Sequence, residues 1–158
     1  DAALNVEPEF NEKVAILNNG VEAFHKLGVK MPKVAIIGAV ETVNPKMQPS
    51  VDAALMTMMN KRNQITGCIV DGPLALDNAV SLEAAHHKGI ESPVAGDVDL
   101  ILTPDIYSAN IMYKTLNFMG GATSAAVIMG ATAPVVLTSR SDTDQSKLFS
   151  IALAAAME

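Results

Sequence analysis

The fold of this chain is decided by KVAIIGAV, residues 33–40, a short run that is apolar at nearly every position and follows a proline. A continuous apolar run of this length predicts a β-strand that is buried on both faces. GCIVDG from Gly67 and VDLILTP from Val98 have the same character, and the segments between them have helical spacing. We therefore expect an α/β domain with a mainly parallel sheet and helices on both faces.

Five helices are expected around these strands, because apolar residues recur at steps of three and four. They cover residues 10–24, a segment that starts after Pro49 with Ser50 as N-cap, and residues 77–87, 105–116 and 142–157. The expected inner stripes are Phe10, Val14, Leu17, Val21 and Phe24; Val51, Ala54, Leu55 and Met58; Ile106, Ala109, Tyr113 and Leu116; and Leu148, Ile151, Ala152 and Ala155. TSAAVIMG from Thr123 and PVVLTS from Pro134 predict two more buried strands.

The composition narrows the classes of function. The chain has 158 residues, a formal net charge of −6 and 4% aromatic residues, which argues against a nucleic-acid surface. Its apolar runs are too short to cross a membrane. A single cysteine, Cys68, excludes an intrachain disulfide and a multi-cysteine zinc site, and it fits a cytoplasmic location. We expect no metal site, since the adjacent His86 and His87 would point to different faces of a helix.

Polar residues follow several strands, at the edge where parallel sheets bind their ligands. The segment TSRSDTDQSK, residues 138–147, carries one of the two arginines and leads into a helix. A helix N-terminus beside a guanidinium favours an anion, whereas the same residues also suit a simple helix cap. Glu41 to Asn44 form a polar loop at a strand end, and their chemistry alone favours an ordinary turn before Pro45. The residues alone leave both alternatives open.

Several motifs in order along the chain carry a resemblance. They are DAALNVEP, PKVAIIGAVETVNPKM, CIVDGPLALDNAVS, AAHHKGI, VAGDVDLILTPDI, ANIMYK and GATAPVVLTSRSDT through SIALA, and together they cover almost the whole chain. The sequence resembles the phosphate acetyl/butyryl transferases, and more closely their phosphate butyryltransferase branch. The resemblance implies reversible transfer of a short or branched acyl group between CoA and phosphate. Coenzyme A is then a substrate, and no permanently bound cofactor is expected.

The resemblance also implies roles for single residues. Ser139 would hydrogen-bond the CoA sulfur or the oxyanion, and Arg140 would hold phosphate. Ser146 stands where acetyl-specific members have a proposed general base, so Asp142 or Asp144 would replace it, and we assign Asp144 as the third catalytic residue. The residues expected to bind the substrates are Asn110, Lys114, Thr138, Ser141, Glu41 and Asn44.

The same resemblance implies a two-domain protein with the fold of isocitrate and isopropylmalate dehydrogenases. Residues 1–131 would be the inserted second domain, and residues 132–158 would return to a first domain whose N-terminal part is absent from this chain. The chain lacks an initiating methionine, so we expect a fragment or a trimmed chain that is inactive alone. A homodimer is expected, with the missing N-terminal segment needed to complete the site.

Two other functions remain open. A metal-dependent hydroxyacid dehydrogenase of similar fold would need clustered acids, and the spacing of Asp71, Asp77, Asp97 and Asp99 does not follow that pattern. A non-catalytic protein that binds CoA or acyl phosphate would be consistent with Ser146. The sequence leaves the length of the acyl chain undetermined.

Overall fold

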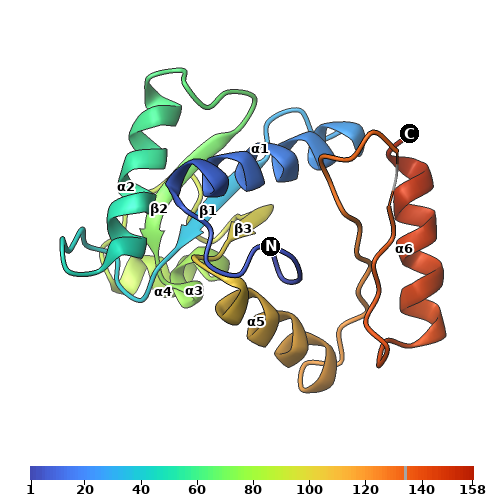
Figure 1. Cartoon of the computed structure of the whole chain (residues 1–158). Helices are drawn as coiled ribbons and strands as arrows, with labels where there is room; N and C mark the ends of the chain where they lie inside the picture. Colours follow the sequence, from blue (N-terminus) through green and yellow to red (C-terminus); the bar gives the residue numbers. More distant parts are fainter. Residues whose placement is uncertain (134) are drawn as a thin grey trace.

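The three runs around residues 33, 67 and 98 form one parallel sheet in the computed structural model, which describes residues 1–133 and 135–158 (Figure 1). The strands are β1 (Lys33–Ile37), β2 (Ile69–Leu74) and β3 (Leu100–Leu102), in the order β2-β1-β3. The central strand pairs with both neighbours, and Val34 lies opposite Val70 on one side and Leu100 on the other. The predicted α/β class with a parallel sheet is confirmed, although the sheet has fewer strands than expected.

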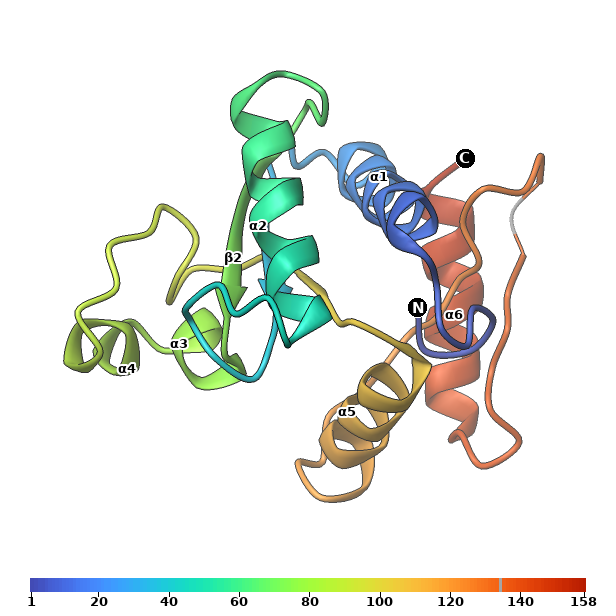
Figure 2. The same ribbon diagram turned by 60° about the vertical axis from the view of Figure 1, so that its left-hand side comes forward.

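Helices cover both faces of this sheet, as predicted. Side chains alternate along a strand, so Val34 and Ile36 enter one core while Ala35 enters the other. Helices α1 (Phe10–Lys26) and α2 (Gln48–Lys61) contribute to the first core, and the short helices α3 (Leu76–Val80) and α4 (Leu82–His87) contribute to the second. Figure 2 shows α1 and α2 on the side of the sheet away from α3 and α4.

Helix α2 exposes part of the stripe that was predicted to be inside. It begins at Gln48 with Met47 as N-cap, so Ser50 lies in the first turn and is not the cap. Leu55 and Met58 are about half exposed. The inward side carries Ser50, Asp52, Ala53, Met56 and Thr57. Polar residues are tolerated there because they are paired: Asp52 accepts from Lys13 on α1 at 2.7 Å, and Thr57 Oγ1 donates to the carbonyl of Gly72.

Two boundaries also differ from the prediction. The helix expected over residues 77–87 is interrupted at Ser81, whose backbone is extended and whose hydroxyl accepts a hydrogen bond from the Ala84 amide as the N-cap of α4. The strand predicted over residues 67–72 begins at Ile69 and continues beyond Gly72 to Leu74. Gly72 suits this close pairing, since a Cβ there would lie 2.7 Å from the carbonyl oxygen of Ile36.

The last part of the chain differs most from the prediction. Helix α5 (Ile106–Phe118) follows β3 with Asp105 as its N-cap, and helix α6 (Asp144–Ala156) has Thr143 as its N-cap. The strands predicted from Thr123 and from Pro134 do not form in the described residues, where only one isolated antiparallel bridge joins Ile128 and Val135; Pro134 itself lies outside them. A strand needs a hydrogen-bonded neighbour, and neither of these segments pairs with β3, which lies at the edge of the described sheet.

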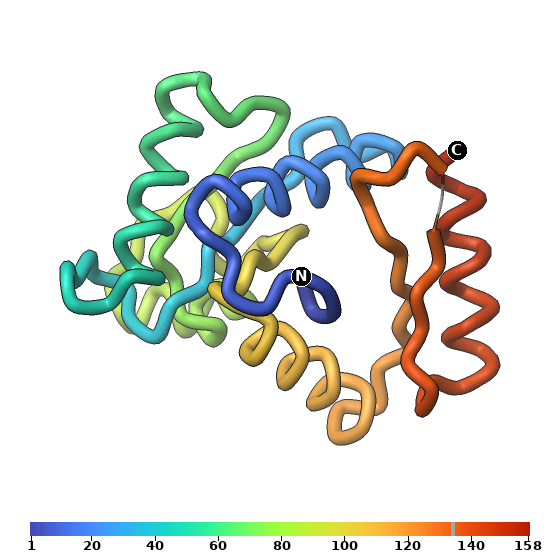
Figure 3. The backbone as a smooth tube through the Cα atoms, in the orientation of Figure 1, coloured from blue at the N-terminus to red at the C-terminus, as the bar shows by residue number. Residues whose placement is uncertain are grey.

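The stripe predicted to be buried on α6 faces outward. Leu148 and Ile151 are 62% and 59% exposed, and Ala152 and Ala155 are exposed as well. The opposite side packs, with Ser150 Oγ accepting a hydrogen bond from the Ala126 amide at 2.9 Å. Figure 3 shows the connecting segment, orange in the tube, running beside α6. None of the helices in the described residues has the length and apolar character that a membrane-spanning helix needs.

The buried ion pair between α1 and α2 gives a stability prediction. Only 11% of the Lys13 side chain and 5% of the Asp52 side chain are exposed. We expect Asp52→Ala to lower the free energy of unfolding by about 3 kcal/mol, because the Lys13 charge would stay buried without its partner. Urea denaturation followed by circular dichroism measures this loss.

The matched control is Asp97→Ala. Its partner Lys33 lies at 2.6 Å, but 80% of the Asp97 side chain is exposed, so its loss should cost less than about 1 kcal/mol. Equal losses of unfolding free energy in the two variants would show that the buried Lys13–Asp52 pair contributes no more to stability than the exposed Lys33–Asp97 pair.

Candidate active site

A cavity of about 360 Å³ lies between helix α5 and the segment that precedes α6. Five of the residues predicted to form the site line it: Asn110, Lys114, Thr138, Ser139 and Arg140. Ser141 belongs to the same cluster, because its hydroxyl lies 3.0 Å from that of Ser139. The structure therefore brings together six of the nine predicted site residues, from two segments that are more than twenty residues apart.

Helix α5 supplies one wall of this cavity. Asn110 and Lys114 are four residues apart and so share a face of the helix. The Asn110 amide donates to the carbonyl of Ala2 at 3.1 Å, which ties the first residues of the chain to this wall. Lys114 extends across the cavity, and its Nζ lies 3.2 Å from Ser139 Oγ and 3.4 Å from Ser141 Oγ.

The contact between Lys114 and Ser139 has a defined direction. An ammonium group only donates, so Lys114 donates to Ser139 Oγ and leaves the proton of that hydroxyl for another acceptor. The same Nζ lies 5.4 Å from the centre of the Tyr113 ring and 5.6 Å from that of Phe118, within the range of a cation–π contact. Ser139 is thus a hydroxyl donor with a cation beside it, an arrangement that suits an acceptor gaining negative charge.

A tight turn over residues 139–142 presents this hydroxyl. The Asp142 amide donates to the Ser139 carbonyl at 3.1 Å, and the Ser139 amide donates to Asp142 Oδ2 at 2.6 Å. The Tyr113 hydroxyl donates to Asp142 Oδ1, also at 2.6 Å. Burial, and then this bond to Asp142, raises the pKa of Tyr113. Helical periodicity places Tyr113 on an apolar stripe and does not indicate this contact, although its position next to Lys114 in the sequence was a usable signal.

Asp144 lies outside the cluster. It is the first residue of α6, and its fully exposed carboxylate contacts Lys147 at 3.2 Å. Ser146 is buried, and its backbone amide donates to the side chain of the N-cap residue Thr143. Of the two aspartates considered, only Asp142 contacts the residues of the cavity.

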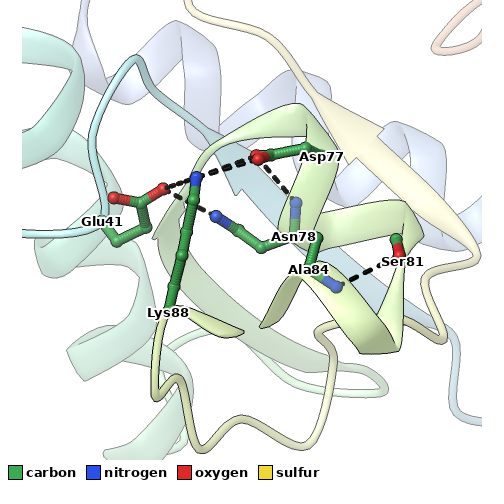
Figure 4. A network of polar contacts seen from close by, with 6 residues as sticks. All are labelled: Glu41, Asp77, Asn78, Ser81, Ala84 and Lys88. Carbon is green, nitrogen blue, oxygen red and sulfur yellow. Dashed lines mark hydrogen bonds and ion pairs between the residues drawn. The ribbon is translucent and has the colours of Figure 1, made fainter. Parts of the chain in front are cut away.

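Glu41 belongs to a second polar cluster, beyond the ends of β1 and β2 (Figure 4). Its carboxylate accepts from Lys88 at 2.6 Å and from the buried Asn78 amide at 2.7 Å, while Lys88 also contacts Asp77 at 2.9 Å. The hydrogen bond from Lys88 is the main cause that lowers the pKa of Glu41 and of Asp77, and the two carboxylates raise the pKa of Lys88. The cluster fastens the loop after β1 to α3 and to the end of α4.

Asn44, the remaining predicted residue, lies in the turn before α2. Its side-chain oxygen accepts from the Lys46 backbone amide at 3.0 Å, and its backbone amide donates to Ser50 Oγ at 2.9 Å. The structure does not bring Glu41 or Asn44 to the cavity at Ser139. In the part of the chain that the structure describes, three or more His, Cys, Asp or Glu side chains nowhere gather in a way that could hold a metal ion.

Known proteins are similar to this chain over nearly its whole length. The family model described as phosphate acetyl/butaryl transferase matches residues 1–155. The chain is 52% identical over 155 residues to the phosphate butyryltransferase of Clostridium beijerinckii, covering 98% of this chain and 51% of that protein. It is 51% identical over 155 residues to the phosphate acetyltransferase of Thermotoga maritima, covering 98% of this chain and 53% of that protein. The chain thus spans about half the length of the curated relatives it matches.

A solved structure is similar as well. The crystal structure of a branched-chain phosphotransacylase from Enterococcus faecalis superposes with a TM-score of 0.91 at 40% sequence identity, covering 99% of this chain and 56% of that one. The comparisons give no support to the hydroxyacid dehydrogenase alternative. The resemblance inferred from the sequence motifs is confirmed, and the chain belongs to the phosphate acetyl/butaryl transferase family.

Proposed function

We propose that the complete protein to which these 158 residues belong is a phosphate acyltransferase. It converts a short or branched acyl-CoA and phosphate reversibly into an acyl phosphate and free CoA. The observation that carries the proposal is the family match over residues 1–155, within which the Lys114–Ser139 contact gives the cavity a polar centre suited to acyl transfer.

The chemistry follows from the groups around the cavity. A phosphate oxygen attacks the thioester carbon, the C–O bond forms, the C–S bond breaks, and the CoA thiolate takes up a proton. The Ser139 hydroxyl, held by Lys114, donates to the oxyanion or to the departing sulfur, where negative charge develops. Arg140 lines the same cavity and supplies a planar fork for phosphate oxygens. Holding phosphate beside the thioester increases its effective concentration.

The proposed binding site is completed by four further residues: Thr138, Ser141, Asn110 and Lys114. Their support is geometric, because they lie on the cavity or on its hydroxyl cluster. The carboxylate of Glu41 is occupied by Lys88 and Asn78, and the Asn44 side chain stabilises its own turn. We therefore narrow the proposed site to the residues from α5 and from the segment that precedes α6.

The proposed organisation has two domains, as in isocitrate and isopropylmalate dehydrogenases. Residues 1–131 form the inserted second domain, and residues 132–158 return to a first domain. Two observations support it: the chain covers about half of its relatives, and residues 135–137 and the outer face of α6 are exposed although they are apolar. Burial in the remaining half would remove these side chains from water. A homodimer in the cytoplasm completes the proposal.

The acyl preference is proposed to favour butyryl or branched chains over acetyl. The C. beijerinckii butyryltransferase and the E. faecalis branched-chain enzyme support it, whereas the T. maritima acetyltransferase is nearly as similar in sequence. Substrate competition must therefore decide the point.

One prediction concerns the reaction itself. The complete protein should release free thiol from butyryl-CoA only when phosphate is present, faster than from acetyl-CoA, and equally well with EDTA. A thiol reagent that changes colour on reaction with free CoA measures the rate. Measurable CoA binding without release from either thioester would instead favour the non-catalytic binding protein.

Another prediction separates the roles of Ser139 and Arg140. Ser139→Ala should lower kcat about 100-fold, because one donor to the developing charge is lost, while the Kd for CoA changes little. Arg140→Ala should mainly raise the KM for phosphate. Steady-state kinetics and calorimetric CoA titration measure both effects.

Ser92→Ala is the matched control, because Ser92 supports a turn remote from the cavity by accepting from the Val94 and Ala95 amides. Its rate should stay within about twofold of the wild type, as for a surface substitution. Equal rates for Ser139→Ala and Ser92→Ala would remove Ser139 from the mechanism.

A further inference from the structure

The Asp142 carboxylate links two segments that are far apart in the sequence. One oxygen accepts from the Tyr113 hydroxyl on α5, and the other accepts from the Ser139 amide in the turn before α6, both at 2.6 Å. Hydrogen bonds of this length to an ionised acceptor belong to the stronger class in proteins. The carboxylate is therefore a bridge between the two walls of the cavity.

This engagement argues against a general-base role for Asp142. A base needs an oxygen within reach of the proton that it takes from the substrate. Both Asp142 oxygens instead face protein donors, and taking up a proton would weaken the bonds to Tyr113 and to the Ser139 amide. The bonds that Asp142 makes hold the turn before α6 against helix α5.

Tyr113 controls both sides of Ser139. Its hydroxyl holds Asp142, which fixes the main chain of Ser139, and its ring lies 5.4 Å from the Lys114 ammonium, which donates to the Ser139 hydroxyl. One side chain thus contacts both the group that holds the main chain of Ser139 and the group that donates to its hydroxyl. Burial and the bond to Asp142 raise the pKa of Tyr113, which keeps its hydroxyl protonated as a donor.

We propose that Tyr113 and Asp142 are positioning residues that aim the Ser139 hydroxyl at the reacting atoms, and that Asp142 is not the general base. The inference rests on the proposed function. It assigns a role to a tyrosine that touches the reactive hydroxyl only through Asp142 and Lys114.

The kinetic test uses the complete protein and compares Tyr113→Phe with Tyr107→Phe. Tyr107 lies on the same helix with its side chain largely exposed, so it controls for the loss of a tyrosine hydroxyl. We expect Tyr113→Phe to lower kcat about tenfold with KM values within about twofold, because misaligned groups slow the reaction more than they weaken binding. Tyr107→Phe should match the wild type.

A second pair of variants separates positioning from base catalysis. Asp142→Asn keeps an oxygen for the Ser139 amide and an NH₂ group for the tyrosine oxygen, so we expect it to restore activity to within about threefold of the wild type, with an unchanged pH profile. Asp142→Ala should lose about tenfold or more. If Asp142→Asn were as impaired as Asp142→Ala, by about 100-fold or more, and had lost the acidic limb of the profile, Asp142 would be the base and the proposal would be wrong. The proposal would also be wrong if Tyr113→Phe behaved as Tyr107→Phe does.

A spectroscopic titration tests the bridge independently of activity. Tyrosinate absorbance of the wild type minus that of Tyr113→Phe reports Tyr113 alone. The same subtraction is made in the Asp142→Ala background, where the pKa of Tyr113 should be lower than in the wild type. Absence of phosphate-dependent thiol release in the wild type would refute the proposed function, and this titration would still decide whether the bridge exists. An unchanged Tyr113 titration in Asp142→Ala would overturn the bridge.

Discussion

Burial of β1 on both faces is the constraint on which the rest of the structure depends. Val34 and Ala35 are fully buried on opposite sides, and each is packed by a different set of helices. The main chain of the strand also satisfies its hydrogen bonds on both edges, through β2 and β3. A register shift by one residue would exchange the contents of the two cores, so the positions of both neighbours follow from this strand. The end of β3 then determines where α5 begins, and α5 carries Asn110, Tyr113 and Lys114 to the cavity.

Much of this fold could be predicted from the sequence because its signal is local. The runs at residues 33, 67 and 98 are apolar and short, and each forms a strand of the sheet, although β3 is reduced to Leu100–Leu102. The caps of α5 and α6 follow the same logic, since Asp105 and Thr143 each accept a hydrogen bond from an amide three residues later. What failed depends on distant partners. The inward side of α2 is polar because Lys13 reaches Asp52 from another helix, and apolar periodicity within α2 carries no information about that pair.

In the candidate site as well, local sequence patterns could be predicted and contacts with distant residues could not. Ser139 and Arg140 could be singled out because a serine–arginine pair after an apolar run and before a helix is a recognisable pattern, and Lys114 entered through the family resemblance. Asp144 was assigned as a catalytic residue through the family resemblance, as a substitute for Ser146, yet in the turn it is Asp142 that contacts Tyr113 and Ser139. Glu41 lies at a strand end, as the rule for parallel sheets requires of a ligand-binding residue, but Lys88 and Asn78 occupy its carboxylate. The position of a residue along the chain indicates which edge it reaches, and only tertiary contacts determine what it meets there.

The outward apolar face of α6 has a consequence for how these 158 residues behave as a solute. Leu148 and Ile151 attract the same surface on another copy, while the formal net charge of −6 keeps copies apart. The two forces respond differently to salt, because added ions screen the repulsion and leave the apolar attraction in place. Added salt therefore weakens the repulsion between isolated copies of the chain and leaves the attraction between their apolar faces unopposed.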